Sequence, residues 1–372
     1  MRTLCVLALL ALQVRYNSVA QTDFNVQLRL NFDSADEIVS LYKGISGSPE
    51  YIAHLRGSQI ALATTGLLAQ RRLTSANLVE SLEAAKYGQS ANDNVFRMEE
   101  ARSNVDQIDE LLTAVKRRNF GQRVVATVAQ LFPSSTRLST SIPIYFVAFG
   151  HKNIDAYVRK VIWHGDVPSF AGDNEPGGEL TIVVNLAKGV HYGLNVEERF
   201  IGLLSIVAHE VFHAAFGVFK ENSPVWREYY ATHNSWLDGL LDLTQNEGIA
   251  HYLTFEQRTN DNLPVDWDQR VQSAFDEFNK TTAELLSPAI SPARASRLIQ
   301  SSNTSGYWES YGAITGLFIA RQIDRTLGRK ALAETIANGP DDFFSKYIAM
   351  ASRDHAFPSL SQQLVGYISR DN

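Results

Sequence analysis

The sequence is poor in cysteine and in histidine. Its 372 residues include one cysteine, Cys5, and nine histidines. Cys5 lies within an apolar run at the N-terminus, so removal of that run would leave a chain with no thiolate to act as metal ligand, nucleophile or disulfide partner. A metal site in such a chain must be built from histidine and carboxylate side chains, and an apolar core must hold the fold together.

The sequence also lacks a basic patch, an internal repeat and a low-complexity tract. Lysine and arginine number 34 against 40 acidic residues, which gives a net charge of −6. The absence of a basic patch disfavours nucleic acid as a partner. Hydrophobic residues make up 45% of the chain and charged residues 20%, as expected for a folded globular protein.

The first 20 residues have the features of a secretory signal peptide. Arg2 supplies a positive charge, residues 4–12 form an unbroken apolar run, and Ser18 and Ala20 are the small residues that a signal peptidase requires. The run is too short to anchor a mature protein in a bilayer. We therefore expect a secreted or periplasmic protein with no transmembrane segment in the mature chain. The alternative is a buried N-terminal helix.

The remaining chain divides into three parts. Residues 21–135 are mostly of helical character and predict an N-terminal helical unit, with helices starting at Asp33 and Ser75 and a longer helix over residues 95–115. Residues 136–260 combine β-rich runs with a long helix, and residues 261–372 predict a C-terminal helical unit. The β-rich runs cover residues 142–149, 157–163 and 180–186.

The long helix of the middle part carries the most informative motif. Asn195, with Glu198 three residues later, predicts its start, and within it stands the sequence HEVFH, from His209 to His213. Two histidines four residues apart lie on the same helical face, so their rings can converge on one ion while Glu210 reaches a water molecule. This spacing is typical of zinc hydrolases in which the glutamate is the general base.

The alternative interpretation is a buried helix with two incidental histidines. The residues around the motif are apolar on nearly every side of the helix. A glutamate in such surroundings costs free energy unless it is paired or lies at a cavity or metal, which favours the metal site.

A catalytic zinc site needs a third protein ligand and an open position. Phe216 and Phe219 occupy the positions where the metzincin motif has glycine and histidine, so that class is excluded. The better candidate is Glu247, which lies 34 residues after His213 in the apolar segment NEGIAH. A surface carboxylate is the alternative interpretation of Glu247. The other candidate ligands are Glu221, His233 and His251. We predict one zinc ion per chain, bound by His209, His213 and Glu247.

The segments HEVFH and NEGIAHYL resemble the gluzincin-type zinc peptidases, and in particular an uncharacterised bacterial family of zinc-dependent peptidases. Residues 31–38, Tyr311 with Gly312, and residues 319–323 also resemble that family. The resemblance implies a zincin-like core with His209, His213 and Glu247 as ligands and Glu210 as base. His251 stands where well-known gluzincins often have a supporting aspartate, four residues after the ligand glutamate.

The resemblance also implies a group that stabilises the oxyanion. Tyr311 is the first candidate for this catalytic role and His251 the second, and Tyr307 is a further possibility. The alternative for Tyr311 is an aromatic core residue at the start of a helix.

The fold we expect is α+β and helix-rich. It has a small, mostly antiparallel sheet, an HExxH helix beneath it, and helices on both sides in sequence. The strand over residues 180–186 precedes the active-site helix, so we predict it to be the edge strand to which an extended peptide pairs. An interior strand is the alternative.

These features together predict a secreted zinc-dependent hydrolase, most simply a metallopeptidase acting on a peptide or protein substrate. Two other readings are a non-catalytic binding module of zincin fold and a zinc hydrolase of a non-peptide bond. Substrate preference and oligomeric state do not follow from the sequence.

Overall fold

The computed structural model describes residues 24–369 apart from residues 90, 92–93, 152–154, 173–176, 260–262, 304–309 and 355. The predicted signal peptide and Tyr307 lie outside the described residues, so their predictions are not tested.

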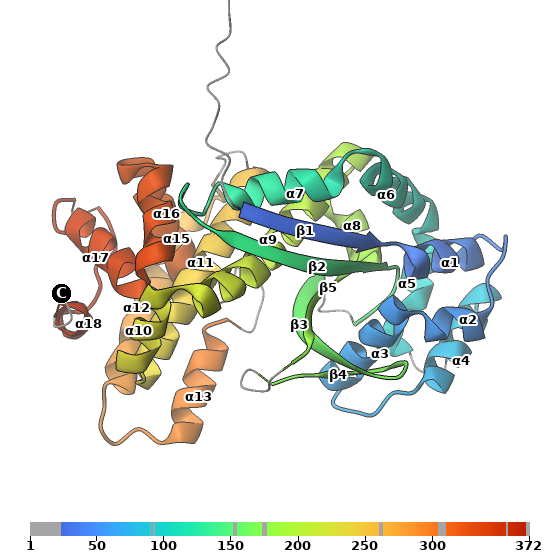
Figure 1. Cartoon of the computed structure of the whole chain (residues 1–372), viewed down its shortest axis with the longest axis horizontal. Coiled ribbons are helices and arrows are strands. Elements are labelled where there is room, and N and C mark those ends of the chain that lie inside the picture. Colours follow the sequence, from blue (N-terminus) through green and yellow to red (C-terminus); the bar gives the residue numbers. More distant parts are fainter. Residues whose placement is uncertain are drawn as a thin grey trace, which may run out of the picture.

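A five-stranded mixed sheet forms the centre of the fold, with the strand order β1-β2-β5-β3-β4 (Figure 1). The strands are β1 (Phe24–Asn31), β2 (Leu138–Val147), β3 (Ala156–His164), β4 (Val167–Phe170) and β5 (Glu179–Asn185). The pairs β1–β2 and β2–β5 are parallel, whereas β5–β3 and β3–β4 are antiparallel. The predicted α+β class is confirmed, but the mostly antiparallel sheet is wrong, because two of the four strand pairs are parallel. Helices within residues 33–129 return the chain from β1 to β2 in the same direction, and β3 and β4 lie in sequence between the parallel strands β2 and β5.

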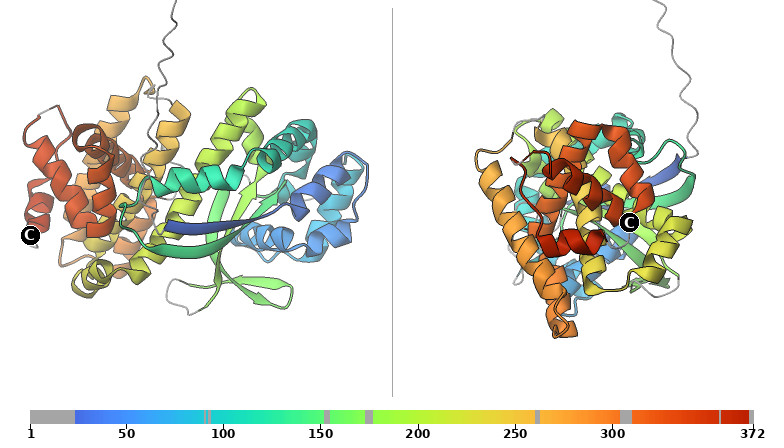
Figure 2. Two further views of the ribbon diagram at one scale, coloured as in Figure 1. Left: turned by 45° about the horizontal axis from the view of Figure 1, so that its top comes forward. Right: turned by 90° about the vertical axis from the view of Figure 1, so that its left-hand side faces the viewer.

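Helices surround this sheet on several sides. Figures 1 and 2 show α1–α6 at one end of the sheet, α7 alongside β1, and α10–α13 with α15–α18 gathered beyond its other end. Those before β2 are α1 (Asp33–Tyr42), α2 (Pro49–His54), α3 (Arg56–Leu68), α4 (Ser75–Lys86), η1 (Asn94–Phe96), α5 (Met98–Ser103), α6 (Val105–Arg117) and α7 (Phe120–Ala129). Those after β5 are α8 (Leu186–Gly189), η2 (Val190–Tyr192), α9 (Val196–Asn222), α10 (Pro224–Thr232), α11 (Trp236–Thr259), α12 (Trp267–Leu285), α13 (Pro292–Ser301), α15 (Tyr311–Leu327), α16 (Arg329–Asn338), α17 (Pro340–Ala351) and α18 (Gln362–Ile368).

The N-terminal part is only partly as predicted. Helices begin at Asp33 and Ser75, as expected. The single helix over residues 95–115 is wrong, because η1, α5 and α6 replace it and Arg97 adopts a left-handed backbone conformation with φ 52°. A left-handed residue interrupts the helical hydrogen-bond ladder and redirects the chain.

Strand β1 was not expected, and it ties the N-terminal helices to the sheet. It pairs with β2 along its whole length, from Phe24 opposite Leu138 to Asn31 opposite Tyr145. The proposed N-terminal unit therefore contributes a strand to the same sheet as the middle part of the chain.

The strand predicted as the edge is an interior strand. β5 lies between β2 and β3, and its residues from Thr181 to Asn185 are buried. Consecutive buried apolar residues, here from Ile182 to Val184, are typical of a strand covered on both faces. A free edge exists instead on β3, because β4 pairs only with the residues from Val161 to His164.

The motif-bearing helix α9 runs for 27 residues. Its predicted start is confirmed, because the Asn195 side chain accepts a hydrogen bond from the Glu198 N–H at 3.0 Å and donates one to the Glu198 carboxylate at 2.7 Å. By length and composition alone α9 could cross a membrane, which the sequence analysis did not anticipate. Its most apolar window is 67% buried by the rest of the fold, as in the core helix of a globular protein.

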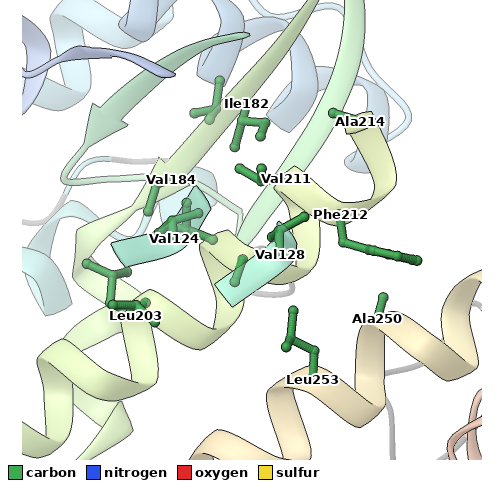
Figure 3. Close-up of a cluster of buried hydrophobic side chains, with 14 of the residues drawn as sticks. Val124, Val128, Ile182, Val184, Leu203, Val211, Phe212, Ala214, Ala250 and Leu253 are labelled. Carbon is green, nitrogen blue, oxygen red and sulfur yellow. The ribbon is translucent and has the colours of Figure 1, made fainter. Parts of the chain in front are cut away.

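Apolar side chains of α7, β5 and α11 pack with those of α9 and hold it in place (Figure 3). Each of those labelled there has an exposed fraction of 2% or less. They are Val124 and Val128 of α7, Ile182 and Val184 of β5, Leu203, Val211, Phe212 and Ala214 of α9, and Ala250 and Leu253 of α11. This packing fixes α9 between the sheet and α11.

Helices α11 and α15 touch through their backbones at a pair of glycines. A Cβ atom on Gly248 would lie 2.3 Å from the Cα of Gly316, and one on Gly316 would lie 2.1 Å from the carbonyl oxygen of Thr244. No larger residue fits at either position without separating the helices. Because Gly248 follows Glu247 directly, this contact also determines where Glu247 lies.

Gly248→Ala should destabilise the protein by about 3 kcal/mol, because the added methyl group would meet backbone that cannot move aside. Gly217→Ala is the matched control, since Gly217 also lies in a helix but has open space where its Cβ would be. The control should gain about 0.5–1 kcal/mol from better helix propensity. Urea denaturation of both variants measures the difference, and equal stabilities would show that the two helices are not in backbone contact.

Candidate metal centre

Helix α9 presents His209 and His213 on one face, one turn apart. Their Nε2 atoms are 2.9 Å from each other, and their ring centroids are 4.5 Å apart at 84°. Two imidazole nitrogens come this close when a proton or a cation lies between them, because their lone pairs otherwise repel.

Helix α11 brings Glu247 to the same point. Its Oε2 is 3.3 Å from Nε2 of His213 and 3.7 Å from Nε2 of His209. Tetrahedral ligands at the usual zinc distances are separated from one another by about 3.3 Å. The three atoms therefore fit one zinc ion, and the fourth position is left for a small ligand.

Each histidine has a partner for its other ring nitrogen. Nδ1 of His213 donates to Oδ1 of Asn246 at 3.0 Å, and a ring N–H of His209 donates to the carbonyl oxygen of Ala250. These bonds fix the tautomer that leaves each Nε2 lone pair free for a metal. Asn246 was not among the site residues predicted from the sequence, although it stands directly before Glu247.

The charges of the cluster favour one shared proton in the metal-free protein. Burial would lower the pKa of His213, but the Glu247 carboxylate outweighs it and raises that pKa to about 9. Burial and the neighbouring histidines hold the pKa of His209 well below its usual value. Burial also opposes ionisation of Glu247, yet His213 and the other two histidines lower its pKa. His213 thus carries the proton, while His209 is neutral and Glu247 ionised.

Glu210 lies in the same cavity, within reach of the backbone of β3. Burial raises the pKa of its carboxyl to about 7, against the opposing charge of His213. The charge of Arg159 and a hydrogen bond from the Val158 backbone also act to lower the pKa of Glu210. A carboxyl with a pKa near neutrality can both accept and release a proton at physiological pH.

His251 is brought to the cluster, on the turn of α11 that follows Glu247. Its Nε2 is 3.7 Å from Oε2 of Glu247, and its ring centroid is 4.5 Å from that of His209. Burial lowers the pKa of His251 to about 4, so its imidazole is neutral at pH 7.

Tyr311 is not brought to the cluster. Its hydroxyl donates to the carbonyl oxygen of Leu298 at 2.8 Å, and its side chain lines a separate cavity with residues of α12. Tyr311 lies at the start of α15, which agrees with the alternative interpretation of an aromatic residue at the start of a helix. Two of the other candidate ligands also lie elsewhere, since Glu221 pairs with Lys160 and His233 with Asp341.

The cluster lines a cavity of about 460 Å³. One wall is formed by residues 156–159 of β3, which the sequence analysis did not connect with the site. The lining residues are Ala156, Tyr157, Val158, Arg159, His209, Glu210, His213, Asn246, Glu247, His251, Asn303 and Ser310. The arrangement joins a potential metal centre, an acid–base group and a strand edge in one cleft.

The chain matches a known protein family. The family model described as "Putative zinc dependent peptidase (DUF5700)" matches residues 50–356, which is more than half of the chain and includes every residue of the cluster. No curated protein and no solved structure matches this chain.

Asn246→Ala should weaken zinc binding about 10- to 100-fold, because His213 would lose the partner that orients its ring. Asn222→Ala is the control, since Asn222 is a helical asparagine too but donates only to the Val218 carbonyl among the described residues and lies at the exposed end of α9. Competition with a chromophoric chelator gives both dissociation constants. Equal zinc affinities of the two variants would contradict a positioning role for Asn246.

Zinc uptake at pH 7 should release about one proton. The pKa of His213 is about 9, so this residue is protonated at pH 7 and zinc must displace its proton. A raised pKa makes the proton a stronger competitor, so zinc affinity should fall as the pH is lowered from 9. Calorimetric titration with zinc in buffers of different ionisation enthalpy measures the number of protons. Zinc binding without proton release would contradict the charge state described above.

Proposed function

The chain belongs to this family of zinc-dependent peptidases, and from that premise we propose that it is a secreted, gluzincin-type metallopeptidase that hydrolyses peptide bonds with Glu210 as general base. The observation that carries the proposal is the convergence of His209, His213 and Glu247 on one point beside a buried Glu210.

One zinc ion per chain would be held by the two Nε2 atoms and the Glu247 carboxylate. Zinc bound there supplies a Lewis acid that polarises a carbonyl oxygen and lowers the pKa of a water molecule. Asn246 and the Ala250 carbonyl would orient the two imidazole rings throughout the reaction.

Glu210 would move the proton. Its carboxylate takes a proton from the attacking water and later gives it to the leaving nitrogen of the cleaved bond. The burial of Glu210 and its raised pKa support this exchange, because a strongly acidic carboxyl would release its proton too early to serve the leaving group.

His251 would stabilise the negative charge that develops on the carbonyl oxygen. Its place on the wall of the cavity and its neutral imidazole support a role as hydrogen-bond donor. We assign this role to His251 instead of Tyr311, because the Tyr311 hydroxyl is engaged with Leu298 in another part of the fold.

The free edge of β3 would bind the substrate backbone. The Lys160 carbonyl accepts from the Ala171 N–H on the side away from β5, so the backbone groups of Val158 and Ala156 point to that same side. In the free protein the Val158 N–H donates to Glu210 and its carbonyl accepts from Arg159, so a bound peptide would replace these two side-chain bonds. An extended peptide can pair there and lie across the cavity. This edge supports a peptide or protein as substrate, and it takes the place that the sequence analysis gave to β5.

The N-terminal sequence supports action outside the cytoplasm. The positive start, the apolar run and the small residues at positions 18 and 20 are those of a cleavable signal. We therefore propose a secreted or periplasmic location for the mature enzyme, with no part for nucleic acid.

Glu210→Gln should keep zinc bound and lose hydrolysis by at least about 100-fold, because the amide cannot accept the proton. Glu221→Gln is the matched control on the same helix, since Glu221 is exposed and pairs only with Lys160 among the described residues. Zinc per chain by mass spectrometry and turnover of casein, short peptides and esters measure the two effects. Peptide hydrolysis that survives in Glu210→Gln would disprove the general-base role, and turnover of esters alone would favour a non-peptide substrate.

A further inference from the structure

Arg159 lies in the cleft beside the metal cluster, on the free edge of β3. Its side chain is partly buried and lines the cavity. Nη1 donates to the carbonyl oxygen of Val158 at 3.0 Å, and the guanidinium lies 5.7 Å from the ring centroid of Tyr157. One of its five N–H donors is therefore used, and the others are available to a ligand.

No carboxylate forms an ion pair with Arg159 in the part of the chain that the structure describes. Other arginines of the fold are paired, as Arg329 is with Glu256 and Asp324, and Arg294 with Glu284. Arg159 attracts the Glu210 carboxylate only from beyond ion-pair distance, so this partly buried guanidinium has lost solvation without gaining a contact ion pair in return. Such a group is stabilised when an anion enters the site.

The charges of the cleft leave Arg159 as the unbalanced group. The described residues that line the cavity include two carboxylates, Glu210 and Glu247. Arg159 is the one lysine or arginine among these described lining residues. Two carboxylates would balance the charge of a bound zinc ion, so the guanidinium would give the cleft a net positive charge. A positive cleft attracts a carboxylate and repels a lysine or arginine side chain.

The free edge ends at Arg159. The next residue, Lys160, accepts a hydrogen bond at 2.9 Å from the backbone of Ala171, where the chain leaving β4 occupies the edge. A peptide paired along residues 156–159 cannot continue past this point in the same line. Its chain end, or the side chain of its last paired residue, would lie about 5 Å from Arg159.

We propose that Arg159 determines substrate specificity by binding a carboxylate of the substrate, either an acidic side chain or a free C-terminus. This inference rests on the proposed function, because it concerns the same cleft. Arg159 would bind the carboxylate through two parallel N–H bonds, which is a geometry that lysine cannot reproduce.

A binding experiment on the zinc-loaded protein tests the proposal without turnover. The probes are succinic acid monohydroxamate, which carries a free carboxylate, and the same hydroxamate with a primary amide in place of the carboxylate. The carboxylate probe should bind at least about tenfold more tightly to the wild type in calorimetry. Arg159→Gln should abolish this ratio, and Arg159→Lys should restore only part of it. Arg227→Gln, at an exposed position of α10 outside the cavity, should keep the ratio.

The two probes separate this inference from the proposed function. Equal binding of both hydroxamates to the wild type, or a ratio that survives in Arg159→Gln, would overturn the role of Arg159 and leave the metal site standing. Failure of both to bind would remove the metal site, and the specificity proposal with it.

Three peptides of one core sequence identify the source of the carboxylate. The first has an acidic side chain and an amidated end, the second a neutral side chain and a free C-terminus, and the third is neutral and amidated. The wild type should cleave the first or the second at least about tenfold better than the third, as judged by kcat/KM, and Arg159→Gln should lose that preference. An equal fall in kcat for all three would mean that Arg159 acts on the reacting oxygen, which would overturn the specificity role.

Discussion

The backbone contact between Gly248 and Gly316 is the constraint on which the geometry of the site depends. Two of the candidate ligands share one helix, so their relative position follows from helical geometry alone. The third comes from α11, and its distance from the other two depends on how α11 packs. Because Gly248 and Gly316 have no side chains, the backbones of α11 and α15 meet directly, which fixes the position of α11 against α15. Ala250 and Leu253 fix its position against α9. A metal centre tolerates errors of only a few tenths of an ångström, so a rigid helix pair suits this task better than a loop would.

The candidate site could be predicted from the sequence where its geometry is local. His209 and His213 share a helical face by spacing, and the apolar surroundings of Glu247 identified a core helix that could return to them. Asn246 could have been found by asking what bonds the second nitrogen of each histidine. Arg159 could not have been found from the sequence, because it lies about 50 residues before the HEVFH motif. No local pattern indicates which end of a strand meets which helix. Tyr311 was proposed from a resemblance, and a hydrogen bond to the Leu298 carbonyl holds its hydroxyl away from the cluster.

The same division between local and long-range information applies to the fold. Three strands and the start of α9 were visible in the sequence, because β-branched runs and capping residues act over a few positions. The order of the strands in the sheet was not visible in the sequence, since it depends on which distant strands pair. β5 illustrates this point, because its consecutive apolar residues from Ile182 to Val184 suit an interior position, yet its proximity to α9 in sequence suggested an edge. The left-handed residue Arg97, which divides the helices after η1, also left no clear signal in the sequence.

The pairing of β1 with β2 has a consequence for how the chain folds. The two strands are separated by more than 100 residues, including all the helices from α1 to α7. Closing a loop of that length costs entropy before the strand pair returns any stabilisation, which slows folding. During synthesis β1 leaves the ribosome long before its partner exists, so the sheet can be completed only once the middle of the chain is present. For the proposed secretion such a delay would be an advantage, because β1 has no partner, and the sheet stays incomplete, until the middle of the chain has been made.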